Sequence, residues 1–155
     1  MSDLLHIPAR PGAPIACDMS TAVDTPDERI DDYGRLFADA LVRRERLDGS
    51  VVLAFRADPA TRAAVEDLVH REAACCPFVD YRVETLGKEI VWTITNPVAG
   101  EDRAGVEVML DAFHGLPDHA GESIDGFFEQ LAARGVEVIE APGSGLGWEF
   151  RRQPA

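Results

Sequence analysis

The stretch that decides the fold is residues 51–95, VVLAFRADPATRAAVEDLVHREAACCPFVDYRVETLGKEIVWTIT. It opens with an apolar alternation over 51–57, which predicts a strand. Asp58-Pro59 then begins a segment with helical spacing of apolar residues, and this segment runs into two adjacent cysteines. Pro77 disfavours α conformation in the residue before it, so we expect the helix to end around Cys75.

Two strand-like segments, YRVET at 81–85 and IVWTIT at 90–95, flank Gly87-Lys88 and predict a hairpin. A third helix should follow, since Val106, Met109, Leu110 and Phe113 have helical spacing. The order β-α-β-β-α is most of a ferredoxin-like arrangement. The sequence therefore predicts an α+β fold with a ferredoxin-like βαββα core, in which helices cover one face of an antiparallel sheet.

Further elements extend this core at both ends. Thr25 and Glu28 have capping-box spacing and predict a first helix, whose apolar face runs on to Leu41. Before it, residues 15–19 (IACDM) suggest a short strand. At the other end we expect a helix, a strand VEVIE and a last strand around WEF.

We expect a single domain over 1–155. It divides into an extended tail (1–14), a core that carries the cysteine motif (15–114) and a C-terminal extension (115–155).

Composition restricts the partners and the compartment. The net charge is −13, which disfavours phosphate backbones and anionic lipid, so we expect neither nucleic acid nor membrane as a partner. No apolar run is long enough for a membrane span, and the N-terminus lacks the pattern of a secretory signal. The three cysteines are an odd number, which argues against a disulfide framework. We therefore expect a cytoplasmic protein with reduced thiols.

The candidate chemistry lies in EAACCPF, residues 72–78. Glu72 shares a helical face with Cys75 and Cys76. A helix C-terminus and a carboxylate both disfavour thiolate, so these sulfurs need a nearby cation to ionise. If Cys17 reaches the pair, three thiolates and Glu72 could bind a soft ion such as Zn²⁺, Cu(I) or Hg²⁺. The leading hypothesis is a binding protein for a soft metal or thiophilic small ligand, acting in resistance, sensing or delivery.

Two alternatives stay open. In the first, the protein is a cysteine-dependent enzyme that acts on a small molecule, with one of the paired cysteines as nucleophile or redox centre and Arg71 or His70 lowering its pKa. In the second, the cysteines only pack as small buried side chains. The ligand pocket is then lined by Trp92, Tyr81 and Phe78.

The motif resembles the signature E-x-x-C-C-P-F of a group of small bacterial proteins. Similar segments look to be appended to transcription regulators of the mercuric-resistance type. The matching residues are Glu72, Cys75, Cys76, Pro77 and Phe78, with Tyr81 and Val83 continuing the strand and Ile15-Ala16-Cys17 upstream. The resemblance covers roughly residues 13–114. It implies a thiol-centred role in binding a small ligand or a metal. Val79 and Asp80 depart from the usual aromatic-aliphatic continuation.

Three further features have simpler interpretations. His114 and His119, with Asp118 between them, could bind a metal, but a helix end followed by a Gly-Leu-Pro turn explains them better. The glycine-rich run at 143–147 lies between strands and favours a hairpin connection over a phosphate loop. Trp148 is expected in the core or on the wall of a cavity.

Overall fold

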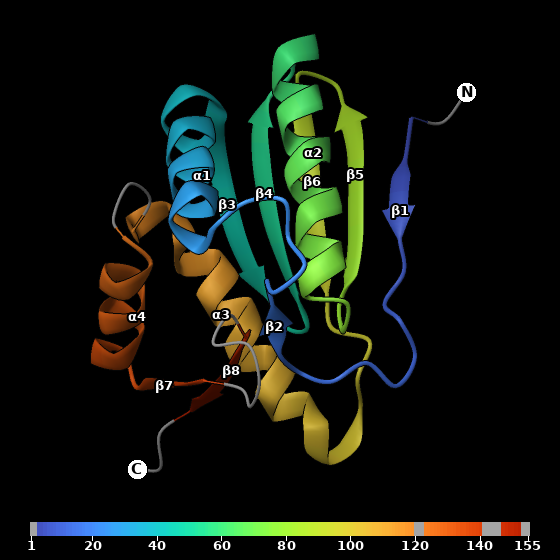
Figure 1. Ribbon diagram of the computed structural model, residues 1–155. Coiled ribbons are helices and arrows are strands. Elements are labelled where there is room, and N and C mark those ends of the chain that lie inside the picture. Colours follow the sequence, from blue (N-terminus) through green and yellow to red (C-terminus); the bar gives the residue numbers. More distant parts are fainter. Residues whose placement is uncertain (1–2, 120–122, 141–146, 153–155) are drawn as a thin grey trace.

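The fold is built on a five-stranded antiparallel sheet in the order β1-β5-β6-β4-β3 (Figure 1). In a computed structural model that describes residues 3–119, 123–140 and 147–152, the bounds are β1 (Leu5–Ile7), β3 (Leu41–Leu47), β4 (Ser50–Arg56), β5 (Asp80–Leu86) and β6 (Glu89–Thr95). The expected strand at 51–57 and the hairpin around Gly87 are confirmed, with φ of 62° at Gly87. The α+β class is also confirmed.

The centre of this sheet is a split β-α-β unit. β4 leads through α2 (Pro59–Cys75) to β5, and β6 lies between the two strands, antiparallel to both. The other neighbour of β4 is β3, which precedes it in the chain, so the complete ferredoxin-like arrangement is not confirmed. β1 pairs with β5, so the expected extended tail contributes an edge strand.

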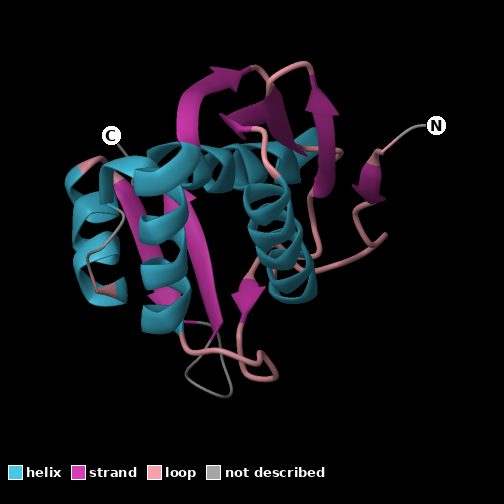
Figure 2. Cartoon of the chain, turned by 90° about the horizontal axis from the view of Figure 1, so that it is seen from above, coloured by secondary structure: helices cyan, strands magenta, loops and turns pink. Residues whose placement is uncertain are grey.

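Three helices cover one face of the sheet: α1 (Pro26–Ala40), α2 and α3 (Arg103–His119) (Figures 1 and 2). Aromatic side chains connect α1 to this face. Tyr33 stacks on Trp92 with ring centroids 6.2 Å apart, and Phe37 stacks on Phe55 at 6.1 Å. The sheet thus buries one side beneath the helices.

A second, smaller sheet packs beside α3. It has the order β2-β8-β7, with β2 (Cys17–Asp18), β7 (Val136–Glu140) and β8 (Gly147–Arg152), and α4 (Ile124–Ala133) lies next to it. The short strand expected within 15–19 is therefore confirmed, as is the C-terminal helix-strand-strand. Residues 141–146, which hold most of the glycine-rich run, lie outside the described residues.

Two expectations about helix ends were wrong. Helix α1 ends at Ala40, and Leu41 begins β3, because LVRRERL pairs with β4 rather than continuing the helical face. Helix α3 runs through Pro117 to His119, where the sequence predicts a turn. Among the described residues, no helix combines the length and apolarity that crossing a membrane requires.

Candidate functional site: a cysteine cluster beside an apolar pocket

The cluster is positioned by the C-terminal end of α2. Asp58 caps the start of this helix by accepting from the Thr61 amide at 2.8 Å. The helix ends at Cys75, and Cys76 leaves helical geometry with φ of −124° while its N–H donates to the Glu72 carbonyl at 2.6 Å. Glu72, Cys75 and Cys76 therefore sit on the last turn, where the proline predicted the helix to stop.

Cys17 reaches the pair. Its sulfur is bonded to that of Cys76 across 59 positions of sequence, with Cα atoms 4.6 Å apart. The expectation that all three thiols are reduced was therefore wrong for these two, because β2 brings Cys17 against the end of α2. The sequence separation gives no sign of this approach. Cys75 keeps a free thiol.

The free thiol is buried and close to its neighbours. Cys75 is 4% exposed, and its Sγ lies 3.6 Å from the Cys76 Sγ and 3.8 Å from Glu72 Oε2. Burial, and next the negative charge of Glu72, raise the pKa of Cys75 to about 12. The sequence argument that these sulfurs do not ionise unaided agrees with this direction.

The cation beside the sulfurs is Arg29, which sequence reasoning missed. From α1 it donates to Glu72 Oε1 at 2.9 Å and to the Cys75 sulfur at 3.5 Å, and it is only 4% exposed. Asp24 accepts from its other two nitrogens at 2.6 and 2.7 Å. The one available signal was a charged residue on the apolar face of α1, four residues before Tyr33.

This pairing shifts the acid–base properties of the partners. Burial alone would lower the pKa of Arg29, but Asp24 and Glu72 raise it above its ordinary value. The hydrogen bonds from Arg29 lower the pKa of Asp24. Both groups are therefore charged at neutral pH, and the cluster contains a fixed positive charge.

Arg71 and His70 have different surroundings from those expected. Arg71 forms ion pairs with Asp24 at 2.7 Å, Asp32 at 3.0 Å and Asp67 at 2.8 Å. His70 is exposed, and both residues line a hollow of about 190 Å³ on one side of Cys75. Of the cations on the described residues, Arg29 is the one with a hydrogen bond to a cluster sulfur.

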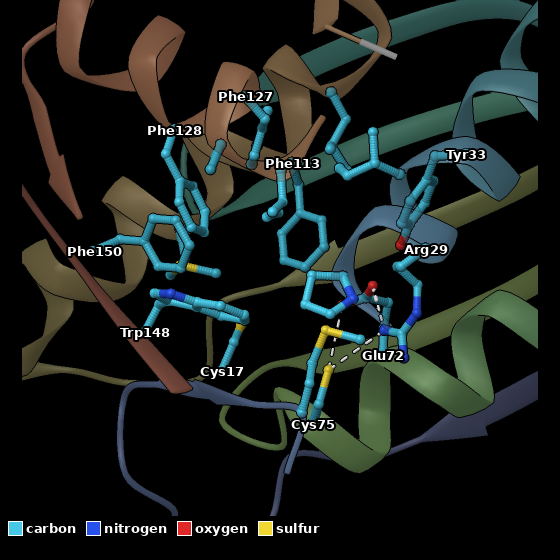
Figure 3. A pocket seen from close by; sticks show the side chains of 17 residues that line it. Cys17, Arg29, Tyr33, Glu72, Cys75, Phe113, Phe127, Phe128, Trp148 and Phe150 are labelled. Atoms are coloured by element: carbon cyan, nitrogen blue, oxygen red, sulfur yellow. Dashed lines mark hydrogen bonds and ion pairs between the residues drawn. The ribbon is translucent and has the colours of Figure 1, made fainter. Parts of the chain in front are cut away.

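A cavity of about 80 Å³ lies on another side of the cluster. Figure 3 shows aromatic side chains along one part of its wall, and Arg29, Glu72, Cys75 and Tyr33 at the other end. The aromatic wall comes from α3, α4 and β8: Phe113, Phe127, Phe128, Trp148 and Phe150. The cavity is therefore apolar with one polar, sulfur-bearing end.

Two tyrosines flank the cluster differently. Tyr33 lines the cavity, and its buried hydroxyl has no hydrogen-bond partner within the described part of the chain. Burial, and next the charge of Glu72, raise its pKa. Tyr81 donates instead to the Cys76 carbonyl at 2.7 Å. Tyr81, Trp92 and Phe78 pack in the core and do not line this cavity, whereas Trp148 does.

In the described part of the histidine candidate, two arginines occupy the carboxylate of Asp118. The Asp118 carboxylate accepts from Arg44 at 2.6 Å and from Arg134 at 3.3 Å, and these bonds lower its pKa. Burial, and next Arg44, lower the pKa of His114. The side chain of His119 lies outside what the structure describes. His6 pairs with Asp80 at 2.9 Å.

Comparison with known proteins gives no match to a family model, a curated protein or a solved structure.

Proposed function

We propose that the protein binds a soft metal ion or a thiophilic small ligand through Cys17, Cys75, Cys76 and Glu72 when its cysteines are reduced. One observation carries the proposal: the sulfur of Cys17, from β2, joins the two cysteines and the carboxylate at the end of α2. The ligand atoms of Glu72, Cys75 and Cys76 lie within 4.8 Å of one another, and the Cys17 sulfur is bonded to that of Cys76.

The spacing of the donors supports this role. Two thiolates bound to Zn²⁺ at about 2.3 Å in a tetrahedron lie roughly 3.8 Å apart. The sulfurs of Cys75 and Cys76 are separated by 3.6 Å. Thiolate donors favour Zn²⁺, Cu(I) or Hg²⁺ over hard cations. The donor set therefore fits a soft ion without a large rearrangement of the two neighbours.

The charges around the cluster support it as well. A metal ion replaces the thiol protons, which removes the obstacle that the raised pKa of Cys75 presents to ionisation. Arg29 donates to both Glu72 and the Cys75 sulfur, so it offsets the excess negative charge of three thiolates and a carboxylate. The Cys17–Cys76 disulfide withholds two donors, so binding requires reduction.

The test compares reduced and oxidised protein. Each is mixed with Zn²⁺, Cu(I) or Hg²⁺ in turn, and bound metal and reactive thiols are counted after gel filtration. We expect one ion per reduced chain, protection of all three thiols, and no such complex with the oxidised chain. Cys75→Ser should weaken binding by at least tenfold, whereas His70→Ala, at an exposed neighbouring position, should not. Thiols that all react freely while the ions are present would overturn the proposal.

The disulfide favours a second candidate, a thiol-redox enzyme that acts on a small molecule. The observation that favours this enzyme is that the Cys76 sulfur, which is part of the disulfide, lies 3.6 Å from the sulfur of Cys75. The weakness is that Cys75, with a pKa raised to about 12, is a poor nucleophile at neutral pH. Turnover of a small organic disulfide in the presence of a thiol reductant, abolished in Cys75→Ser, would favour this candidate. No turnover by the wild-type chain would reject it.

A further inference from the structure

The cavity has a polar end with two cysteines and an apolar wall elsewhere. Cys17, Cys75 and Glu72 line its polar end, and Arg29 borders it there. The remaining wall is almost entirely apolar, and aromatic rings form part of it (Figure 3). Met109 and Ala112 of α3 also line it. A bare metal ion needs only the polar end, so the apolar part has no role in binding such an ion.

The apolar wall determines what else can enter. A polar or charged group placed there would lose its hydration without finding hydrogen-bond partners, which is costly. Each aliphatic carbon buried there gains about a factor of four in affinity from the hydrophobic effect. The wall therefore selects ligands with an apolar part.

Building on the proposed function, we propose that the natural ligand is a soft element that carries one short alkyl group. The soft atom binds the sulfurs of Cys75 and Cys17, the two cysteines that line the cavity, and the alkyl group occupies the aromatic-walled space. Two cysteines line the cavity, which matches a trivalent centre with one bond to carbon and two left for thiolates.

The size of the cavity limits the alkyl group. Its volume is about 80 Å³. An engineered apolar cavity of about 150 Å³ binds benzene, so roughly half that volume suits a methyl or ethyl group better than a ring. The ligand class is therefore a short-chain organo-derivative of a thiophilic element.

Trivalent organoarsenic provides a probe with balanced chemistry. Methylarsonous acid, CH₃As(OH)₂, reacts with two thiols to give CH₃As(SR)₂ and two molecules of water. Two As–O bonds break, two As–S bonds form, and the thiol protons leave with the hydroxide groups. No electrons are transferred. The disulfide must first be opened by a phosphine and one molecule of water. The phosphine is oxidised to the phosphine oxide with the oxygen of the water, and the two protons of the water leave Cys17 and Cys76 as thiols.

The test uses the full chain, reduced with the phosphine, and three probes: methylarsonous acid, phenylarsine oxide and Zn²⁺. Tryptophan fluorescence follows binding, since Trp148 lines the cavity. Ala112→Leu places extra carbons in the cavity, and Ala63→Leu adds the same group at an exposed position of α2. Ile124→Phe, which also narrows the cavity, serves if Ala112→Leu does not fold.

We expect Ala112→Leu to weaken methylarsonous acid binding at least tenfold while Zn²⁺ binding stays within twofold, and Ala63→Leu to change neither. Phenylarsine oxide should bind the wild-type chain at least tenfold more weakly than the methyl compound. Zn²⁺ binding with no methylarsonous acid binding, or with equal binding by Ala112→Leu, overturns this inference and leaves the proposed function standing. Tighter binding of the phenyl compound overturns the size limit. Failure of all three probes overturns the proposed function itself.

Discussion

The guanidinium of Arg29 donates to the carboxylate of Glu72 at 2.9 Å, from residues 43 positions apart. The side chains of the two residues are only 4% and 9% exposed. The pair connects α1 to the end of α2 at the point where the cysteines meet. A buried pair of this kind depends on both partners, because removal of one leaves the other charged and unpaired.

Replacement of Arg29 by Ala should destabilise the protein by about 3–5 kcal/mol, because Glu72 then loses its buried cation and Asp24 keeps only Arg71. Urea unfolding at pH 7 measures this loss. Arg35→Ala is the matched control on the same helix, and its loss should stay below about 1 kcal/mol because Arg35 is 71% exposed. A loss from Arg29→Ala as small as that of the control would contradict the importance assigned to the buried pair.

Alkylation of Cys75 by iodoacetamide should be slow at neutral pH. With a pKa of about 12, about one thiol in ten thousand is ionised at pH 8. In the oxidised chain this is the one free cysteine, so its rate can be followed alone. The rate should rise tenfold per pH unit from 7 to 10 without the plateau that a thiol of ordinary pKa approaches near 9.

One variant and its control test how far Glu72 raises the pKa of Cys75. Glu72→Gln removes a negative charge that raises the pKa of Cys75, so alkylation at pH 8 should become faster. Glu66→Gln, on the same helix and paired with Arg62, should leave the rate unchanged.

Because the pKa of Cys75 is raised in the folded state, the free energy of unfolding should fall as pH rises from about 9 towards 12. A wild-type rate that levels off near pH 9 would disprove the shift.

Loss of the Cys17–Cys76 disulfide should lower stability by about 4 kcal/mol. Chain-entropy reasoning gives this magnitude for a closed loop of about 60 residues, and the two cysteines are separated by 59 positions. Thermal unfolding of Cys17→Ser, compared with the oxidised wild type, measures the loss. Cys75→Ser keeps the disulfide and serves as the control. Equal Tm values for Cys17→Ser and wild type would rule out a stabilising cross-link.

Acid should remove part of the contribution of Asp24. The hydrogen bonds from Arg29 lower the pKa of Asp24 in the folded state below its usual 3.8. Its contribution to stability is therefore complete above about pH 4 and is lost as pH falls through the folded-state value. The difference in free energy of unfolding between wild type and Asp24→Asn should be large at pH 7 and smaller at pH 2.5. A difference that does not change with pH would argue against this ion pair.

Local patterns in the sequence predicted much of the core. The capping box of Thr25 and Glu28 is present, with both of its hydrogen bonds, and the alternation in 51–57 forms β4. The strand Leu41–Leu47 was missed because it is rich in charge, which is tolerated in β3 where Arg44 and Arg46 reach Asp118 and Asp111 of α3.

The site was predictable in part. Glu72, Cys75 and Cys76 lie together because one helical turn places them there, and helical spacing can be read from sequence. The approach of Cys17 and the insertion of Arg29 depend on how β2 and α1 pack, which are long-range relationships. Neither the disulfide nor the aromatic wall of the cavity has a local signature, since their residues come from elements far apart in the chain.

Cys17 belongs to β2, whose register pairs it with Trp148 of β8, while Cys76 directly follows the last residue of α2. The bond between their sulfurs thus fastens the small sheet to the helical layer of the large one. Reduction removes this covalent link between β2 and the end of α2, and a ligand held by Cys17 together with Cys75 would restore a link between the two elements. The hydrogen exchange of the β8 amides would then report from a distance on whether the sulfurs are oxidised, free or occupied.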